Sequence, residues 1–200
     1  ESLLAVYSGN VGVKQGLDIL VSAAERLKDD PGIRIVICGD GARRPALEAR
    51  VRKAELSNVT FLPLQPTVHY WEMLTDADVC VVSQLAQSGA AFFPSKLLSI
   101  LAFASPVLAV ADADSALARA VEEGAFGFVL RPDDPAGMAD CFRSLARDPA
   151  RLATLGQSGK QFVTQFETET VMRRVESEWK ALIDGSHLQP APGAAPDRIG

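Results

Sequence analysis

Several features that would mark large classes of protein are missing from this sequence. Lys and Arg number 20 against 25 Asp and Glu, and the resulting net charge of −5 argues against a surface for nucleic acid or for an anionic membrane. No apolar run approaches the roughly 20 residues that span a bilayer. The first residue is Glu rather than Met, so we expect the sequence to be part of a longer protein.

Cysteine and histidine are scarce. Cys38, Cys80 and Cys141 are an odd number, widely separated, with no pair at metal-ligand spacing. This pattern favours small reduced core residues in a cytoplasmic protein. The two histidines, His69 and His187, have no nearby cysteine or paired carboxylate, so we expect no metal site.

Carboxylates are absent from a long central stretch. Between Asp78 and Asp112 there is no Asp or Glu, so a general acid, a general base or a metal-binding carboxylate cannot come from that stretch. Asp40 is the best-placed carboxylate elsewhere, and its glycine neighbours are typical of a turn. No Ser/His/Asp or Cys/His set assembles, so no catalytic residue can be assigned.

Short apolar runs alternate with amphipathic segments along most of the chain. This alternation predicts an α/β protein with a Rossmann-like parallel sheet, helices on both of its faces and a helical C-terminus. The expected strands cover residues 3–7, 33–38, 58–62, 77–82, 106–110 and 127–130. The first expected helix begins at residue 17, one or two helical turns are expected within 67–75, and another helix is expected to begin at residue 94. The remaining expected helices cover residues 45–53, 115–122, 135–146, 149–164 and 168–183.

The C-terminal end changes character. From Gly185 onward the chain is rich in Pro, Ala and Gly without an apolar period, so we expect one domain over residues 1–184 and a disordered tail over 185–200. The preceding segment, 168–183, carries an apolar stripe on one face. The stripe consists of Val171, Val175, Trp179 and Leu182.

A glycine turn follows the first strand. Gly9 and Gly12 permit a tight turn and close approach of a ligand, and Lys14 adds a cation. The apolar spacing from Leu17 to Leu27 predicts a helix directly after the turn, whose first N–H groups would suit an anion. The turn matches neither G-x-G-x-x-G nor G-x-x-x-x-G-K-[ST], and an ordinary strand-to-helix turn with a solvated lysine remains an equal alternative.

A second candidate for anion binding lies in residues 87–96. Gly89 loosens this loop, Pro94 sets the first helical φ, and Ser95 and Lys96 add a hydroxyl and a cation. Ligands of such sheets bind outside the carboxyl ends of the strands, so two helix starts meeting there would suit a diphosphate. The alternative is that Ser95 and Lys96 are ordinary polar residues of a first helical turn.

Together these motifs give the chain a family resemblance over roughly residues 3–183. It resembles the C-terminal, donor-binding domain of a GT-B glycosyltransferase, closest to family 4 retaining enzymes of bacterial surface-polysaccharide synthesis. The motifs are Ser-Gly-Asn-x-Gly-x-Lys-Gln-Gly at 8–16, Ile-Cys-Gly-Asp-Gly at 37–41, Val-Thr-Phe-Leu-Pro at 59–63, Ala-Asp-Val at 77–79, Pro-Ser-Lys-Leu-Leu at 94–98 and Ser-Pro-Val at 105–107.

The resemblance implies a nucleoside-diphosphate sugar as substrate, no metal and a sugar moved to a glycan or lipid-linked acceptor. The implied diphosphate-binding residues are Gly9, Asn10, Gly12, Lys14, Ser95 and Lys96. The implied nucleoside-binding residues are Phe61, Leu62, Pro63 and Ser99. The implied sugar-proximal residues are Ser88, Gly89, Ala90 and Ala91.

The resemblance also implies a second domain that binds the acceptor. This chain would then be a fragment, inactive alone, of a cytoplasmic enzyme that can work at the inner face of the membrane. Since the last helix of such enzymes crosses back to the other domain, we expect Trp179 to be exposed here or covered by a second copy of the chain.

Two departures from the family pattern affect the expected site. Asn10 stands where many relatives carry Arg, and Ala91 and Ser99 stand where many carry a pair of Glu, the second of which holds the ribose. Ser99 can make only a weaker contact there. Two alternatives stay open. One is a domain similar to nucleotide-sugar 2-epimerases, which share the fold but need several acidic and His residues at the crevice that this sequence does not offer. The other, favoured by the missing Glu pair, is a catalytically silent module for nucleotide binding or assembly.

Overall fold

The computed structural model describes residues 2–87 and 94–183. The chain divides into two units, Glu1–Val163 and Thr164–Gly200. The candidate sugar-proximal residues 88–91 and the expected tail from 185 lie outside the described residues.

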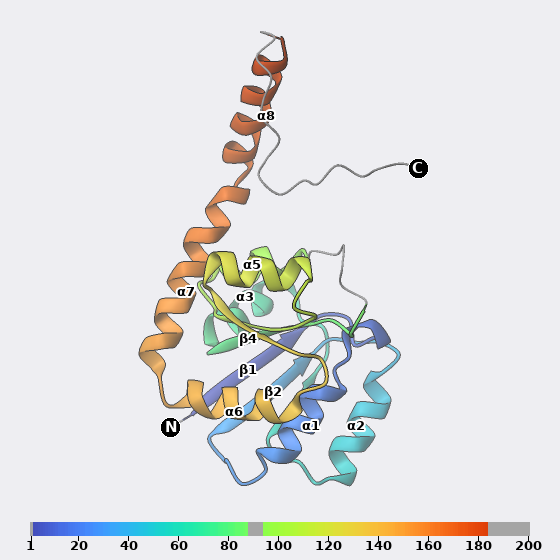
Figure 1. Ribbon diagram of the computed structural model, residues 1–200. Helices are drawn as coiled ribbons and strands as arrows, with labels where there is room; N and C mark the ends of the chain where they lie inside the picture. The colour runs from blue at the N-terminus through green and yellow to red at the C-terminus, as the bar shows by residue number, and fades with distance from the viewer. Residues whose placement is uncertain (1, 88–93, 184–200) are drawn as a thin grey trace. The chain divides into compact units, whose positions relative to one another are not determined.

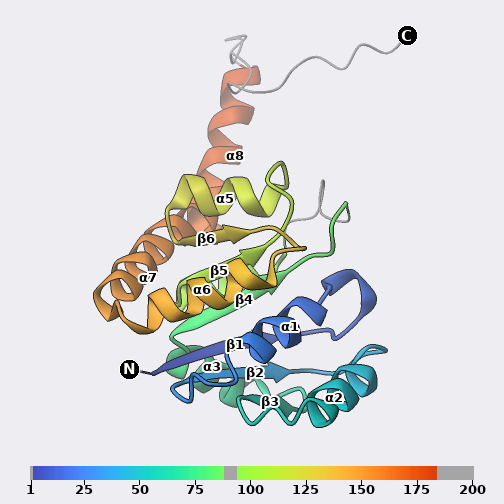
Figure 2. The same ribbon diagram turned by 60° about the horizontal axis from the view of Figure 1, so that its bottom comes forward.

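Six strands of the first unit form one parallel sheet, in the order β3-β2-β1-β4-β5-β6 (Figure 2). Each paired neighbour runs in the same direction, so the carboxyl ends of the strands share one edge. The chain reverses its direction of travel across the sheet between β1 and β4, where a parallel sheet opens a crevice for ligands. The strands are β1 (Leu3–Ser8), β2 (Ile33–Cys38), β3 (Val59–Leu62), β4 (Val79–Ser83), β5 (Val107–Val110) and β6 (Gly127–Leu130).

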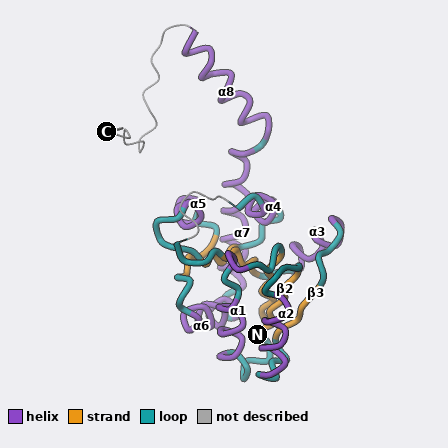
Figure 3. The backbone as a smooth tube through the Cα atoms, turned by 90° about the vertical axis from the view of Figure 1, so that its right-hand side faces the viewer, coloured by secondary structure: helices purple, strands orange, loops and turns teal. Residues whose placement is uncertain are grey.

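Helices cover both faces of the sheet, as predicted, and each face has its own apolar cluster (Figures 1 and 3). The first face packs against α1 (Asp18–Arg26), α2 (Arg44–Lys53) and α6 (Pro135–Ala146). The second packs against α3 (Thr67–Asp76), α4 (Lys96–Ala102) and α5 (Ala116–Gly124), with the end of α7 (Pro149–Val163). The alternation of side chains along β1 explains the division, since Leu3 and Ala5 join the first cluster and Val6 joins the second.

Most expected elements are present within a few residues of their predicted ends. The segment 67–75 was expected to form only one or two turns but is the ten-residue helix α3. The helix expected from Pro94 begins at Lys96 and is seven residues long. The buried face of α1 is the predicted one, since Leu17, Leu20 and Leu27 are fully buried.

The helix predicted from residue 17 is present as α1, but it does not follow Gly12 at once. Gly12 instead precedes the short 3-10 helix η1 (Val13–Gln15), which ends at Gly16 with a left-handed φ of 59°. The left-handed conformation of Gly16 separates η1 from α1, and the N–H groups of Ile19 and Leu20 at the start of α1 donate to the carbonyl oxygens of Gly16 and Leu17. Lys14 lies in η1, where its carbonyl oxygen accepts a hydrogen bond from the N–H of Leu85.

The second unit contains η2 (Thr164–Phe166) and α8 (Thr168–Ile183). Val171, Met172, Val175 and Trp179 of α8 are exposed, and 67% of the Trp179 surface is accessible. Over the described ranges, no helix combines the length and the apolar character that crossing a membrane requires.

Candidate functional site

The turn after β1 is held against the turn after β2. The N–H of Gly9 donates to the carbonyl oxygen of Cys38 at 2.9 Å, and the N–H of Val11 donates to that of Asp40 at 2.8 Å. Gly39 has a φ of +141°, and a Cβ there would overlap the carbonyl oxygen of Gly9. Glycine is therefore required at position 39 for the two turns to approach so closely.

Tyr7 supports the first turn from beneath. Its side chain is fully buried, and its hydroxyl donates a hydrogen bond of 2.6 Å to the carbonyl oxygen of Asn10. Burial raises the pKa of the phenol, so the hydroxyl stays protonated and acts as a donor. The last strand residues before the turn thus fix the position of Asn10.

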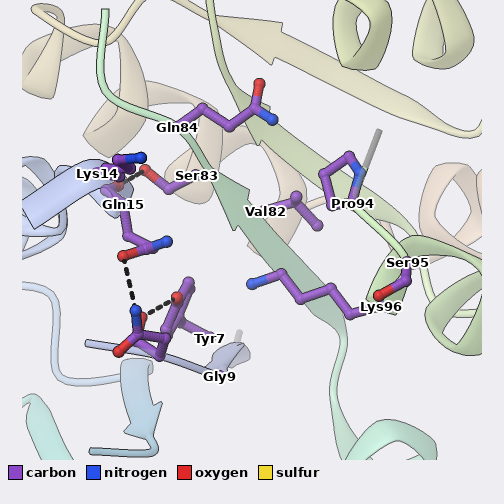
Figure 4. Close-up of a pocket in the computed structure, with 11 residues that line it drawn as sticks. Tyr7, Gly9, Lys14, Gln15, Val82, Ser83, Gln84, Pro94, Ser95 and Lys96 are labelled. Atoms are coloured by element: carbon purple, nitrogen blue, oxygen red, sulfur yellow. Dashed lines mark hydrogen bonds between the residues drawn. The ribbon is translucent and has the colours of Figure 1, made fainter. Parts of the chain in front are cut away.

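Lys96, the first residue of α4, points into the crevice between β1 and β4 (Figure 4). Its ammonium donates to the carbonyl oxygen of Ser8 at 3.1 Å and lies 4.0 Å from the centre of the Tyr7 ring. Burial lowers the pKa of Lys96 to about 8, an effect that the neighbouring thiol of Cys80 opposes. A carbonyl dipole and an aromatic face stabilise the ammonium less than a carboxylate would, so the cation is available to an anionic ligand.

A first cavity of about 490 Å³ opens at this crevice (Figure 4). Its volume falls within the range usual for small-molecule sites. Lys14 and Lys96 are the charged residues among its described lining, which contains no Asp or Glu. The lining consists of Tyr7, Gly9, Asn10, Lys14, Gln15, Val82, Ser83, Gln84, Pro94, Ser95 and Lys96.

A second cavity of about 480 Å³ adjoins the first, and Gly9, Ser95 and Lys96 line both. Its other lining residues are Ser8, Leu64, Gln65, Thr67, Tyr70 and Ser99. Burial raises the pKa of Tyr70, and a hydrogen bond with Ser99 opposes that shift. The second cavity therefore presents neutral hydroxyl groups, and Lys96 stands in the wall between the two spaces.

The structure brings most of the predicted diphosphate-binding residues to the first cavity. Gly9, Asn10, Lys14, Ser95 and Lys96 line it, whereas Gly12 caps η1 beside the side chains of Asn10 and Gln15. Ser95 and Lys96, at the start of α4, line the cavity, whereas the start of α1 is separated from the glycine turn by η1 and Gly16 and contributes no residue to the described lining.

Among the predicted nucleoside-binding residues, Ser99 lines the second cavity. Phe61, Leu62 and Pro63 lie at the end of β3, and the cavity lining begins at the next residue, Leu64. The carbonyl oxygen of Leu62 accepts hydrogen bonds from Gly39 and from Arg44.

Arg44 organises this end of β3, a role that the sequence did not reveal. Its guanidinium donates to the carbonyl oxygens of Gly39 and Leu62, and lies 5.8 Å from the centre of the Phe61 ring. A third hydrogen bond, of 2.8 Å, joins the guanidinium to the Glu48 carboxylate one turn along α2. Arg44 therefore fixes the backbone at the end of β3, two residues before Leu64, which lines the second cavity.

The sequence also did not indicate Tyr7, Gln15 and Tyr70 as site residues. In the sequence Tyr7 fits the apolar pattern of a buried strand. Its phenol at the carboxyl end of that strand was a signal that could have indicated a site residue. Gln15 reaches the side chain of Asn10 at 3.5 Å, and its carbonyl oxygen accepts a bond from Ser83. Only the pairing of β1 with β4 places these groups together.

Within residues 2–87 and 94–183, no three His, Cys, Asp or Glu side chains gather as metal ligands would. The cations that a bound anion would meet in the described lining are Lys14 and Lys96.

The fold and its crevice define a Rossmann-like domain with a cation-lined site at the switch point of the sheet. The chain belongs to the family Glycosyl transferases group 1, whose sequence pattern matches residues 1–162. The predicted family is thereby confirmed, and with it the predicted GT-B glycosyltransferase domain.

Two curated relatives illustrate the similarity. The chain is 36% identical over 119 residues to WcaI of Escherichia coli K12, named "Putative colanic acid biosynthesis glycosyl transferase", covering 60% of this chain and 29% of that protein. It is 32% identical over 162 residues to the D-inositol 3-phosphate glycosyltransferase of Nocardia farcinica, covering 76% of this chain and 35% of that protein. The match thus spans about a third of each relative's length.

A solved structure agrees in fold. HepE of Anabaena, crystallised with UDP, superposes with a TM-score of 0.76 at 16% identity, covering 90% of this chain and 49% of HepE.

Proposed function

We propose that this chain binds the nucleoside diphosphate of a nucleotide-sugar donor and serves as the donor-binding domain of a glycosyltransferase. The observation that carries the proposal is the pair of adjoining cavities, whose charged lining residues are the cations Lys14 and Lys96. A diphosphate needs positive charge, and a nucleoside needs a neighbouring space with neutral hydrogen-bonding groups. The UDP in the HepE crystal structure supports the same ligand class.

In this proposal the diphosphate occupies the first cavity, and the nucleoside extends into the second toward Tyr70 and Ser99. Lys14 and Lys96 stabilise the charge that develops on the leaving diphosphate when the bond to the sugar breaks. We expect this stabilisation to come from the lysines rather than from a resident metal. The transferred sugar would then lie on the side of the first cavity facing the acceptor.

The proposed reaction moves the sugar to a glycan or lipid-linked acceptor, as in polysaccharide synthesis. We propose that a further, acceptor-binding domain completes the enzyme and that this chain alone does not turn over. The three cysteines, at positions 38, 80 and 141, are widely spaced free thiols, which favours a reaction in the cytoplasm. A lipid-linked acceptor would place that reaction at the inner face of the membrane. We also propose that two copies of the chain can associate through the apolar face of α8.

The test is calorimetric titration of the 200-residue chain with UDP, GDP and ADP, each alone and as a sugar conjugate. At least one diphosphate should bind, and the matching monophosphate should bind at least tenfold more weakly because it contacts fewer donors. Lys96→Met should abolish the preference for the diphosphate. The matched control is Lys53→Met, because Lys53 is an exposed lysine of α2 outside both cavity linings. Absence of binding by all six ligands would contradict the proposal and favour a silent module.

A further inference from the structure

The surroundings of Lys96 are unusual for a lysine. Its ammonium lies between the carbonyl oxygen of Ser8 and the ring of Tyr7, and the described lining of both cavities offers it no carboxylate. A half-buried ammonium that has no carboxylate partner is destabilised relative to the neutral amine. A ligand that brings negative charge into the first cavity would remove that destabilisation.

The other titratable groups around Lys96 come from four elements. Tyr7 of β1 and Cys80 of β4 lie beneath it, Tyr70 of α3 lines the second cavity, and Lys14 of η1 lines the first. Burial raises the pKa of the Cys80 thiol to about 12 and raises the pKa of both tyrosines. At pH 8 to 9 the thiol and the phenols therefore stay protonated and cannot take up a further proton.

We propose that the site takes up a proton when it binds its diphosphate, and that Lys96 is the group that receives it. The inference rests on the proposed function and adds the chemical form in which Lys96 acts. Above about pH 8, where the amine is largely neutral in the empty cavity, it accepts a proton from solvent on binding, becomes an ammonium and donates hydrogen bonds to phosphate oxygens. No other bond forms or breaks.

The direction of the pH dependence follows from the lowered pKa of Lys96, about 8 in the free protein. A bound diphosphate favours the ammonium, so the pKa of Lys96 rises on binding. Affinity should be constant below about pH 7.5, where Lys96 is already charged, and should fall about tenfold per pH unit above about pH 8.5. The second ionisation of a phosphate has a pKa of about 6, so the diphosphate is fully ionised above about pH 7.5. Its own titration therefore does not change the affinity between about pH 7.5 and 9.5.

Calorimetry at about pH 8.5 in two buffers of different ionisation enthalpy measures the proton uptake directly. A group of pKa about 8 is about one quarter protonated there, so about 0.7 proton should be taken up per diphosphate bound. Lys96→Arg keeps the positive charge but cannot release it, so this variant should bind with no uptake and with affinity independent of pH from 7 to 9.5. Lys14→Met should bind more weakly and keep the uptake.

A second measurement follows the titration of Lys96 itself, first without ligand and then with diphosphate. The ¹³Cε resonance of Lys96 in the labelled free chain should titrate with a midpoint near pH 8, and addition of diphosphate should move that midpoint above 9. Two results would overturn this inference and leave the proposed function standing. One is diphosphate binding at pH 7 without proton uptake at pH 8.5, and the other is a titration midpoint of Lys96 above pH 10 in the ligand-free chain. Absence of binding at pH 7 would instead overturn the proposed function and, with it, this inference.

Discussion

The hydroxyl of Tyr7 is joined to the carbonyl oxygen of Asn10 by a hydrogen bond of 2.6 Å, so the phenol beneath the crevice fixes the turn above it. The face of the same ring supports the ammonium of Lys96, 4.0 Å from its centre. One buried side chain therefore positions two groups of the proposed diphosphate site, and the two contacts can be removed separately.

Tyr7→Phe keeps the ring and loses the hydroxyl. It leaves the Asn10 carbonyl without this donor and should lower the free energy of unfolding by about 1–3 kcal/mol. Tyr7→Leu removes the aromatic face as well, so it should weaken diphosphate binding more than Tyr7→Phe does. Urea unfolding and calorimetry measure the two effects, and equal affinities for the two variants would show that the ring does not support Lys96.

Lys14 tests the more exposed cation of the first cavity. Lys14→Ala should weaken diphosphate binding by about 1–3 kcal/mol, as expected for loss of a charge-assisted hydrogen bond. Lys53→Ala changes the net charge equally and serves as the control. If calorimetry gives parent and Lys14→Ala the same affinity, with the fold intact by circular dichroism, Lys14 does not contact phosphate.

Ser99 tests the nucleoside position. Because a carboxylate can accept bonds from both ribose hydroxyls, Ser99→Glu should tighten binding of UDP or GDP, and the gain should shrink for the 2′-deoxy nucleotides. Ser99→Gln has nearly the same size without the charge and should gain less. Unchanged or weaker UDP and GDP binding by Ser99→Glu would mean that the ribose is held elsewhere.

Gly39 tests the contact between the two turns. Gly39→Ala should lower the free energy of unfolding by about 2–4 kcal/mol, because its Cβ would overlap the carbonyl oxygen of Gly9 and its φ is unfavourable for alanine. At Gly12, whose φ is −104°, a Cβ would meet only the side chains of Asn10 and Gln15, so Gly12→Ala should cost much less. Denaturant unfolding of both variants measures the two losses of stability. Similar losses for Gly39→Ala and Gly12→Ala would argue against the close approach of the turn at Gly39 to the turn at Gly9.

Trp179 tests the apolar face of α8. We expect this exposed side chain either to remain in water or to be covered by a second copy of the chain. In the Trp71→Phe background, its emission should be red-shifted and quenched by iodide at low concentration, with a blue shift only where sedimentation shows dimers. A blue-shifted emission that iodide cannot quench, in a monomer, would contradict this expectation.

Much of the fold could be predicted because each element carries its own periodicity. The β-branched run from Ile33 to Cys38 forms β2 without exception, and residues 127–130 form β6 as predicted. The short helix η1 was not predicted, because its pattern is too short to carry a period. Gly16, which ends η1, adopts a left-handed conformation beside Leu85, a contact made only after β4 is in place.

Of the candidate site, the sequence by itself determined which residues could carry charge: Lys14 between two glycines, Lys96 after Pro94 and Ser95, and no carboxylate between Asp78 and Asp112. Local composition suffices for that conclusion. Only the tertiary structure decided that Lys96 meets Ser8, 88 residues away in the chain, over the ring of Tyr7. The reason is physical: such contacts depend on strand order and on which face each strand presents, and β1 and β4 become neighbours only when the apolar clusters on both faces of the sheet are packed.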